Sequence, residues 1–233
     1  MTATPSNNGV TARLREAGVV GAGGAGFPVH VKWAARVDTV IANGAECEPL
    51  LHKDAEIIEN FAAEVLDGLR MAAAATGAER LCFGIKAKKK KAIAEIEKHG
   101  PSRGVELSLL GDYYPTGDEF ELVHAVTGRL IPPAGLPLQV GVVVNNVESL
   151  LNAALAEAGK PVTDKFVTIA GAVKRPTTFR IPLGVSFGEA IAAAGGVTVE
   201  RPAIFVGGVM MGRLTRDLAE PITKTTTGLI VLP

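Results

Sequence analysis

The sequence predicts two domains: an α/β domain built on a parallel sheet, followed by a smaller α+β domain. In the first part of the chain, short apolar segments alternate with amphipathic segments of helical length, the order that gives parallel strands joined by crossover helices. From 160 onward, short alternating segments separated by turns replace this pattern. The 233 residues, of which 47% are apolar, suffice for two modest cores. We therefore expect domains at 1–159 and 160–233.

The elements of the first domain follow in order from this alternation. A short helix at 11–17 precedes a glycine-rich loop, and Pro28 suits the first turn of a helix expected at 28–36. A long helix expected at 55–75 has apolar residues at helical spacing and ends before Gly77. The other expected helices are 88–99, 117–127 and 147–158, and the expected strands are 39–43, 80–85, 104–110 and 140–144. Together they predict a Rossmann-like parallel sheet with covering helices.

The second domain begins after Gly159-Lys160-Pro161, a turn-forming stretch that we interpret as the boundary. Alternating strands at 166–170 and 178–181 flank a turn, and Ser186 suits the N-cap of a helix that ends near Ala194. Further strands are expected at 203–206 and 229–232. A hairpin, a helix and more short strands are typical of a small β-grasp-like module.

Composition excludes several classes of function. Lys+Arg and Asp+Glu number 24 each, so net charge gives no reason to expect nucleic acid or an acidic membrane surface. The lysine run at 86–91 opens an amphipathic helix and is interpreted as a solvated face. No apolar run reaches the ~18 residues of a membrane span, and the first residues lack the pattern of a signal peptide. We expect a cytoplasmic protein without a transmembrane segment.

Cysteine and histidine usage argues against a metal centre held by this sequence. A cubane iron–sulfur cluster uses four thiolates, whereas the sequence has two cysteines, Cys47 and Cys82, which are expected to be reduced thiols. The four histidines show no spacing typical of metal ligands. We assign no metal-binding residue.

The glycine-rich loop Gly21-Ala-Gly-Gly-Ala-Gly26 is the strongest signal of ligand binding. Its backbone can approach a ligand closely, and its N–H groups can converge on a phosphate. Phe27 and Lys32 follow it and add an aromatic ring and a cation. A short helix precedes the loop, with only Val19 and Val20 as strand, so the strand–loop–helix context of a dinucleotide fingerprint is not met.

Three polar stretches follow predicted strands, at 43–48, 112–119 and 145–149. Because ligands in parallel sheets bind beyond the carboxyl ends of the strands, we expect these stretches to meet the glycine loop. Each has a second interpretation. Glu46 and Glu48 could accept hydrogen bonds from ribose hydroxyls or be solvated, while the acids at 118–119 and the asparagines at 145–146 could simply cap helices.

These motifs carry a resemblance to a known family. Their order and spacing resemble the RnfC family of Rnf electron-transfer complexes, including its PduS cobalamin reductase branch, and more distantly the NADH- and FMN-binding subunit of complex I. The motifs are Gly21–Lys32, Asn43-Gly-Ala-Glu-Cys-Glu-Pro49, Tyr114-Pro-Thr-Gly-Asp-Glu119 and Asn145-Asn-Val-Glu-Ser149. Residues 162–233, with Gly207-Gly-Val-Met-Met-Gly212, resemble the SLBB (soluble-ligand-binding β-grasp) domain that follows in these proteins.

The resemblance implies a cleft for FMN and NADH. It implies that Phe27 stacks on the nicotinamide nucleotide, that Lys32 reaches flavin or phosphate oxygens, and that no side chain acts as a nucleophile. The residues that it assigns to the cleft are Gly21, Gly23, Gly24, Gly26, Phe27, Lys32, Asn43, Glu46, Glu48, Tyr114, Gly117, Asp118, Glu119, Asn145 and Asn146.

The implied function is NADH-dependent reduction of FMN, with electrons passing onward to an iron–sulfur or cobalamin acceptor. The family's iron–sulfur segment is missing from this sequence, so we expect either a longer protein, which we favour, or an iron–sulfur partner. Cobalamin or its adenosyltransferase is a further partner that the resemblance implies. It also implies a place in a bacterial microcompartment or on the periphery of a membrane complex. The alternative is a non-catalytic binding or scaffold module.

Overall fold

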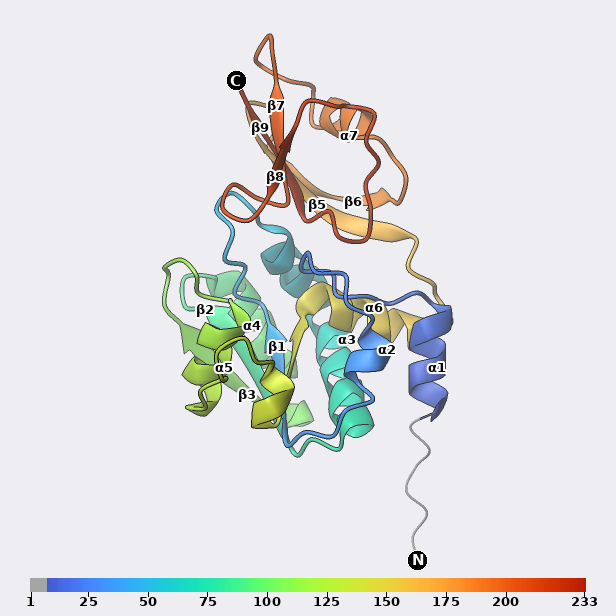
Figure 1. The fold of residues 1–233 in the computed structure, drawn as a ribbon, viewed down its shortest axis with the longest axis vertical. Coiled ribbons are helices and arrows are strands. Elements are labelled where there is room, and N and C mark those ends of the chain that lie inside the picture. Colours follow the sequence, from blue (N-terminus) through green and yellow to red (C-terminus); the bar gives the residue numbers. More distant parts are fainter. Residues whose placement is uncertain (1–7) are drawn as a thin grey trace, which may run out of the picture.

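The computed structural model describes residues 8–233, in which each domain has its own sheet (Figure 1). The first domain contains the helices α1 (Asn8–Glu16), α2 (Val29–Lys32), α3 (Lys53–Thr76), α4 (Lys90–His99), α5 (Glu119–Thr127) and α6 (Val147–Glu157), and the strands β1 (Thr39–Asn43), β2 (Arg80–Lys86), β3 (Val105–Leu110) and β4 (Val142–Asn146). The second contains β5 (Asp164–Gly171), β6 (Thr177–Pro182), α7 (Phe187–Ala193), β7 (Ala203–Val206), β8 (Arg213–Thr215) and β9 (Gly228–Leu232).

The first sheet is entirely parallel, with the strand order β3-β2-β1-β4, and the second is mixed, with the order β6-β5-β9-β7-β8. The predicted fold class, a parallel α/β domain followed by a small α+β domain, is confirmed. The placement of the boundary between 159 and 160 stays a prediction. None of the described helices is both long and apolar enough to cross a membrane.

The strand expected at 140–144 lies two residues later, at Val142–Asn146, and one predicted helix was much too long. The helix expected at 28–36 is only the single turn α2, Val29–Lys32. Trp33 at the C-cap is fully buried, and its indole N–H donates to the Asn145 Oδ1 atom at 2.9 Å. This tertiary contact holds the chain at the point where the helix would have to continue.

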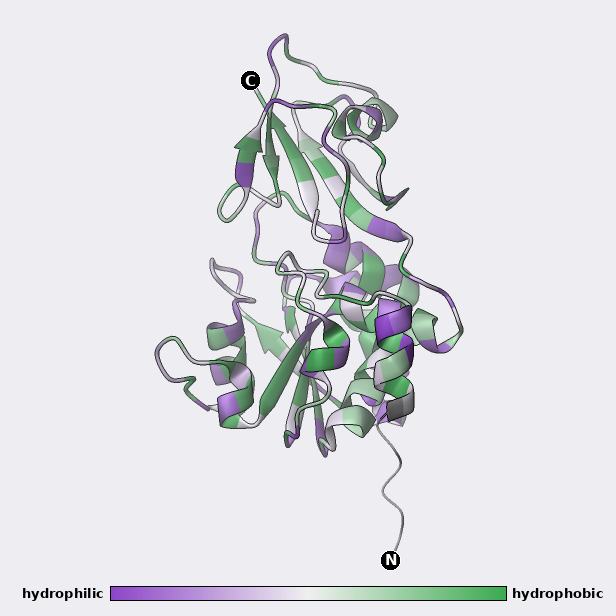
Figure 2. Cartoon of the chain, turned by 45° about the vertical axis from the view of Figure 1, so that its right-hand side comes forward, coloured by the Kyte–Doolittle hydropathy of each residue, from purple (hydrophilic) through white to green (hydrophobic). Residues whose placement is uncertain are grey.

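The first sheet is buried on both faces, as parallel sheets usually are. The centre of β1 is fully buried, and the helices α3, α4 and α6 cover one face while α5 covers the other. Figure 2 shows the hydrophobic residues concentrated on the strands of both sheets. The second domain packs α7 on its own sheet, where Phe187 meets Val167, Leu229 and Val231.

Strand register brings two of the predicted polar stretches together. Asn43, the last residue of β1, pairs with Asn146 at the end of β4, and Ala42 pairs with Asn145. The second domain lies across this end of the first domain (Figure 1). The carboxyl ends of the strands therefore face a second layer of protein.

Gly68 permits a close approach between the helices α3 and α6. A Cβ atom at this position of α3 would overlap the backbone carbonyl of Leu150 in α6. Since backbone atoms cannot move aside cheaply, this glycine fixes how closely α3 and α6 pack.

We expect Gly68→Ala to lower the free energy of unfolding by about 1–3 kcal/mol, because overpacking against a backbone outweighs the ~1 kcal/mol that alanine gains in helix propensity. Chemical denaturation measures the change. Glu64→Ala, an exposed position of α3, is the control and should be nearly neutral. A Gly68→Ala protein as stable as the control would show that the two helices are not held at this distance.

Candidate functional site

A cavity of about 820 Å³ lies between the two domains. Its volume falls within the roughly 300–1,000 Å³ that is usual for cofactor pockets. Thirteen of the fifteen residues predicted for the cleft line it, and the exceptions are Gly26 and Tyr114. The lining residues from the prediction are Gly21, Gly23, Gly24, Phe27, Lys32, Asn43, Glu46, Glu48, Gly117, Asp118, Glu119, Asn145 and Asn146.

The glycine loop forms one wall of the cavity as a closed turn. The Gly21 N–H donates to the Phe27 carbonyl at 2.8 Å, and the Gly26 N–H donates to the Gly21 carbonyl at 3.0 Å. A Cβ atom at Gly24 would meet nothing within 4 Å, so the backbone there borders open space. The Phe27 side chain is 49% exposed at the rim. Glycine in this wall leaves room for a bound ligand.

Lys32 places its ammonium group between β4 and the beginning of α5. Its Nζ atom donates to the Val144 carbonyl at 2.9 Å and lies 3.6 Å from the Glu119 Oε1 atom. The cation is thus fixed at the carboxyl end of β4 and faces the first turn of α5. This position suits electrostatic attraction of an anionic or carbonyl oxygen in the cavity.

Asn43 joins two loops of the cavity. Its Nδ2 group donates to the Gly117 carbonyl at 2.7 Å, while its Oδ1 atom accepts from the Ala45 N–H at 3.1 Å. Gly117 has a positive φ of 106°, which glycine adopts without strain. Asn43 therefore positions the loop before α5.

Glu46 is half-buried in the cavity wall, and one of its carboxylate oxygens is fully buried. Its Oε1 atom accepts from the Asp54 N–H at 3.2 Å, whereas its Oε2 atom is buried without a partner in the described structure. Burial, followed by the negative charge of Asp54, raises the pKa of Glu46 from 4.5 to about 7. The backbone at Glu46 has a φ of 42°, an uncommon conformation for a residue other than glycine. Glu46 is therefore not a fully solvated side chain, and its role as a ligand acceptor stays a prediction.

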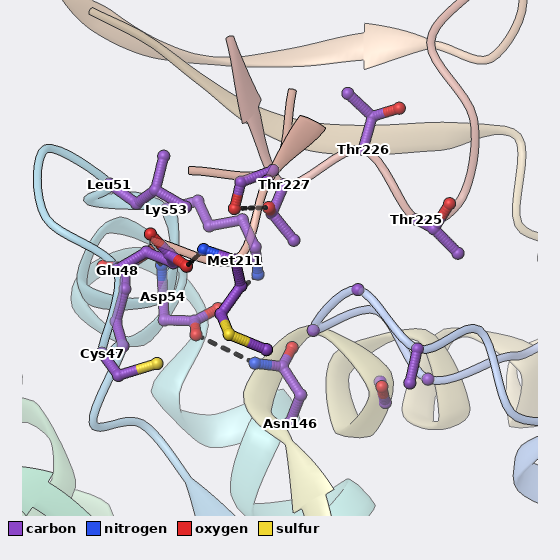
Figure 3. A pocket seen from close by; sticks show the side chains of 18 of the residues that line it. Cys47, Glu48, Leu51, Lys53, Asp54, Asn146, Met211, Thr225, Thr226 and Thr227 are labelled. Carbon is purple, nitrogen blue, oxygen red and sulfur yellow. Dashed lines mark hydrogen bonds and ion pairs between the residues drawn. The ribbon is translucent and has the colours of Figure 1, made fainter. Parts of the chain in front are cut away.

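Glu48 holds a loop of the second domain. Its carboxylate accepts from the backbone N–H group of Met210 at 3.0 Å and from that of Met211 at 2.7 Å, the second of which is drawn in Figure 3. Cys47, between the two glutamates, also lines the cavity, and burial followed by the charge of Glu48 raises the pKa of its thiol. The Glu48 carboxylate thus already has two donors, both from the second domain.

The polar residues that begin α5 and α6 serve as caps while lining the cavity. The Asp118 side chain accepts from the Phe120 N–H at 2.9 Å, and the Asn146 side chain accepts from the Glu148 N–H at 3.0 Å. Asn145 Oδ1 accepts from Trp33, but its Nδ2 group is buried without a partner in the described structure. Capping and ligand binding are therefore compatible interpretations for these positions.

Two sets of residues at this site were missed by the sequence analysis. The first is a wall supplied by the second domain, comprising Phe187, Val206, Gly207, Met211, Gly212, Arg213, Glu220, Pro221, Thr223, Thr225, Thr226 and Thr227. No motif in the sequence places this domain over the strand ends. The contact also explains Gly26, where a Cβ atom would crowd the side chain of Thr225.

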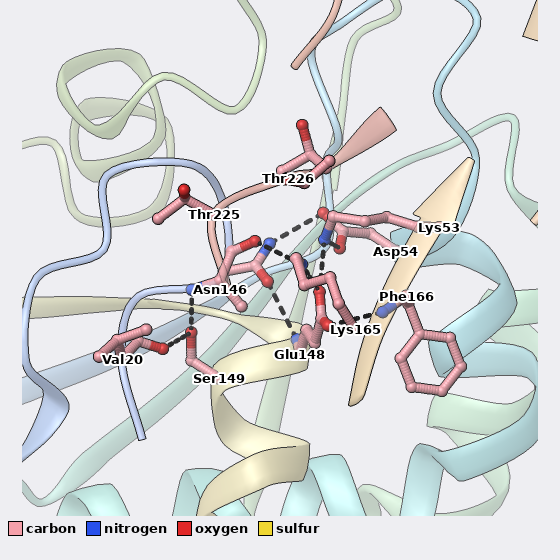
Figure 4. A network of polar contacts seen from close by, with 12 residues as sticks. Val20, Lys53, Asp54, Asn146, Glu148, Ser149, Lys165, Phe166, Thr225 and Thr226 are labelled. Atoms are coloured by element: carbon pink, nitrogen blue, oxygen red, sulfur yellow. Dashed lines mark hydrogen bonds and ion pairs between the residues drawn. The ribbon is translucent and has the colours of Figure 1, made fainter. Parts of the chain in front are cut away.

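The second set is a buried charge cluster, which we define as Lys53, Asp54, Glu148 and Lys165. Lys53 Nζ contacts Asp54 and lies 3.1 Å from Glu148 Oε2, and Lys165 Nζ also contacts Glu148 (Figure 4). Burial opposes the charge on Lys53, but its two carboxylate neighbours raise its pKa. Burial and the like charge of Lys53 lower the pKa of Lys165 to about 8, despite the attraction of Glu148.

A sequence signal for this cluster does exist. Lys165 alternates with Val167 and Ile169 on the buried face of β5, so a lysine occupies a position where period-2 spacing favours an apolar residue. Such a lysine is expected to have a buried carboxylate partner. Glu148 lies within the motif at 145–149, but its partner is distant in the sequence.

Comparison with known proteins supports the cleft as a cofactor site. The Nuo51 FMN-binding domain family matches residues 14–155, and the SLBB domain family matches residues 166–214. The chain is 48% identical over 222 residues to the cobalamin reductase PduS of Citrobacter freundii, with 95% of this chain and 49% of the relative covered. It is 39% identical over 225 residues to a component of the proton-translocating ferredoxin:NAD(+) oxidoreductase complex of Clostridium ljungdahlii, covering 94% and 49%.

A solved structure supports the fold. The air-oxidized NAD+-reducing [NiFe]-hydrogenase superposes with a TM-score of 0.79 at 26% identity, covering 97% of this chain and 47% of that chain. The chain thus spans about half the length of the relatives it matches. These comparisons confirm the resemblance inferred from the motifs, both domain types and the expected flavin cofactor.

The raised pKa of Glu46 predicts a pH dependence of stability. The folded protein binds a proton at this group between pH 4.5 and about 7 that the unfolded chain releases, so the contribution of Glu46 is lost as pH rises through 7. The loss is on the order of 3 kcal/mol at most, from 2.5 pKa units at ~1.36 kcal/mol each. We expect Glu46→Gln to be more stable than the wild type at pH 8, with a smaller difference at pH 5.

Urea denaturation at a series of pH values measures this effect. Glu56→Gln, an exposed position of α3, is the control and should show no such pH-dependent difference. If the Glu46→Gln and wild-type stabilities differed by the same amount at pH 5 and pH 8, the carboxyl group would have its ordinary pKa.

Proposed function

The chain belongs to the Nuo51 FMN-binding domain family, and on this premise we propose that it is a flavoprotein that holds FMN between its two domains and takes electrons from NADH. The observation that carries the proposal is a pair of buried, unpartnered polar groups in the cavity wall, Glu46 Oε2 and Asn145 Nδ2. Buried polar groups in proteins nearly always have a hydrogen-bond partner. A ligand with both donors and acceptors would satisfy the two groups together.

The residues present fit FMN. Glu46 and Asn145 offer hydrogen bonds to a flavin ring or its ribityl hydroxyls, and the wall at Gly23 and Gly24 leaves space for a planar group. Lys32 supplies a fixed cation near the strand ends. When bound, FMN supplies a two-electron acceptor for the hydride of a nicotinamide nucleotide.

The protein's own contribution is positioning. The exposed ring of Phe27 provides a stacking surface at the rim, and Asp118 and Glu119 present acceptors for ribose hydroxyls at the start of α5. The second domain closes the other side of the cavity and limits the access of water. Orientation and electrostatics of this kind are what a protein supplies to hydride transfer between cofactors.

The second part of the proposal concerns the carrier that receives electrons from the flavin. The sequence has two cysteines, too few for a cubane cluster, so we assign the next carrier to an iron–sulfur protein or segment. Reduction of cobalamin as the final step rests on the 48% identity to PduS. The same identity supports a place in a microcompartment, whereas the match to the proton-translocating oxidoreductase complex supports a place beside a membrane complex.

Flavin titration tests the core of the proposal. We expect FMN fluorescence to be quenched on binding at micromolar concentration, and anaerobic addition of NADH to bleach the bound flavin. Bound flavin that NADH does not bleach would favour the alternative, a binding or scaffold module. If the protein bound no FMN at all, the proposal that it is a flavoprotein would be excluded.

Gly23→Ala should weaken FMN binding without unfolding the protein. The new methyl group would lie in ordinary contact, 3.4 Å from the Asn146 side chain, at a position that lines the cavity. Because excess volume in a packed site costs about 1–3 kcal/mol, the FMN dissociation constant should rise about tenfold to a hundredfold. Gly9→Ala on α1, outside the cavity, is the control. Unchanged FMN affinity would show that the flavin does not reach this wall.

Glu119→Gln should weaken reduction by NADH more than it weakens FMN binding. Glu119 is a partly exposed acceptor at the mouth of the cavity, and losing a charged hydrogen bond to the nucleotide should raise the NADH concentration for half-maximal bleaching about tenfold. Glu121→Gln in the same turn is the control, since Glu121 does not line the cavity. Equal effects on NADH and FMN would contradict the assignment of Glu119 to the nucleotide side.

A further inference from the structure

The buried charge cluster joins elements from both domains. Its two cations and two carboxylates balance in number, and all four side chains are at most 6% exposed. Three of these residues come from the first domain, and Lys165 comes from the first strand of the second. The Glu148 carboxylate also accepts from the Phe166 N–H at 3.0 Å, so two consecutive residues of β5 are attached to it.

Lys165 makes one contact that no other member of the cluster makes. Its Nζ atom donates to the carbonyl of Ala22, in the middle of the glycine loop, at 3.0 Å. The Ala22 N–H in turn donates to the Ser149 Oγ atom at 2.9 Å, and that hydroxyl donates to the Val20 carbonyl at 3.2 Å. Figure 4 shows Ser149 and Glu148 on α6 between the loop and β5. The Ala22 residue is therefore held on one side by the first domain and on the other by the second.

Neutralising Glu148 does not by itself account for Lys165. Lys53 lies 3.1 Å from Glu148 but also pairs with Asp54, so Lys165 does balance the remaining negative charge; yet a buried ion pair can often be replaced by apolar residues at little cost in stability. The carbonyl of Ala22, by contrast, has an ammonium donor only from Lys165 among the described hydrogen bonds. Lys165 does not line the cavity, so it acts on the cavity through the loop.

We propose that Lys165 is a positioning residue for the cofactor site: through the Ala22 carbonyl it fixes the glycine loop in the conformation that receives the flavin. The second domain thus completes the flavin site of the first. This proposal rests on the proposed function for its flavin readout, and a second readout on the ligand-free protein keeps the two separable.

Three variants test the proposal. Lys165→Met removes the donor, but it also leaves a buried carboxylate in excess and is expected to lower stability. Lys165→Met combined with Glu148→Gln removes one charge of each sign, leaves the Lys53–Asp54 pair intact and should recover much of that stability. Lys224→Met is the control, because Lys224 of the second domain also donates to a backbone carbonyl, that of Gly18, but outside the cluster.

The first measurement is FMN affinity by fluorescence quenching. Loss of a hydrogen bond from a charged donor should raise the dissociation constant about tenfold or more in Lys165→Met and in the double variant alike. The control should bind as the wild type does. The second measurement is amide hydrogen exchange of the ligand-free protein, in which the Gly21, Ala22 and Gly26 amides should exchange about tenfold faster in both Lys165 variants.

The double variant decides the outcome. If it regains wild-type flavin affinity and wild-type exchange of the loop, Lys165 only balances charge and the proposal is overturned. If it is stable while the loop still exchanges fast and flavin still binds weakly, Lys165 positions the loop. Should wild-type protein bind no flavin, the flavoprotein proposal fails, and the exchange of the loop amides still decides the role of Lys165.

Discussion

The burial of four charges at one point is the constraint on which the arrangement of this molecule depends. A lone ammonium or carboxylate in a protein interior costs several kcal/mol, so Lys53, Asp54, Glu148 and Lys165 can be buried only in each other's company. They come from the first turns of α3 and α6 and from the beginning of β5. These three segments must therefore lie next to one another. These polar contacts fix the two domains relative to each other together with apolar ones, namely Phe61 against Phe166 and Leu51 in one cluster with Ala170 and Ile230.

The cavity is a consequence of this junction. The cluster, the glycine loop and Asn145 all lie at the same end of the first sheet. When the cluster forms, the second domain therefore covers the cavity at this end. Glu48 adds a second polar contact between the domains, because its carboxylate accepts from the backbone N–H groups of Met210 and Met211. Ligand binding and domain contact thus share one region, and a change in either is expected to affect the other.

The sequence predicted what depends on local pattern. Alternating apolar and amphipathic segments predicted the parallel sheet, and strand ends placed Asn43 near Asn146 because parallel strands share their carboxyl edge. The sequence pattern could not predict that the helix ends before Trp33, whose indole donates to Asn145, or that Glu48 binds the second domain. Both features depend on contacts between residues more than 100 positions apart in the sequence. The resemblance assigned Gly26 to the cleft, and pattern could not predict that a Cβ atom there would crowd Thr225 of the second domain.

Burial, together with the charge balance of the cluster, explains why the pKa of Glu46 is raised. The cluster is neutral without it, so an ionised Glu46 beside Asp54 is a third carboxylate against two ammonium groups. Burial first and the negative charge of Asp54 second raise the pKa of Glu46 to about 7, and its Oε2 atom has no hydrogen-bond partner in the described structure. A bound ligand that donates a hydrogen bond there would stabilise the ionised form, whereas one that accepts would stabilise the protonated form. The negative charge of Asp54, a member of the buried cluster, therefore adds to burial in favouring the protonated form of a group in the cavity wall.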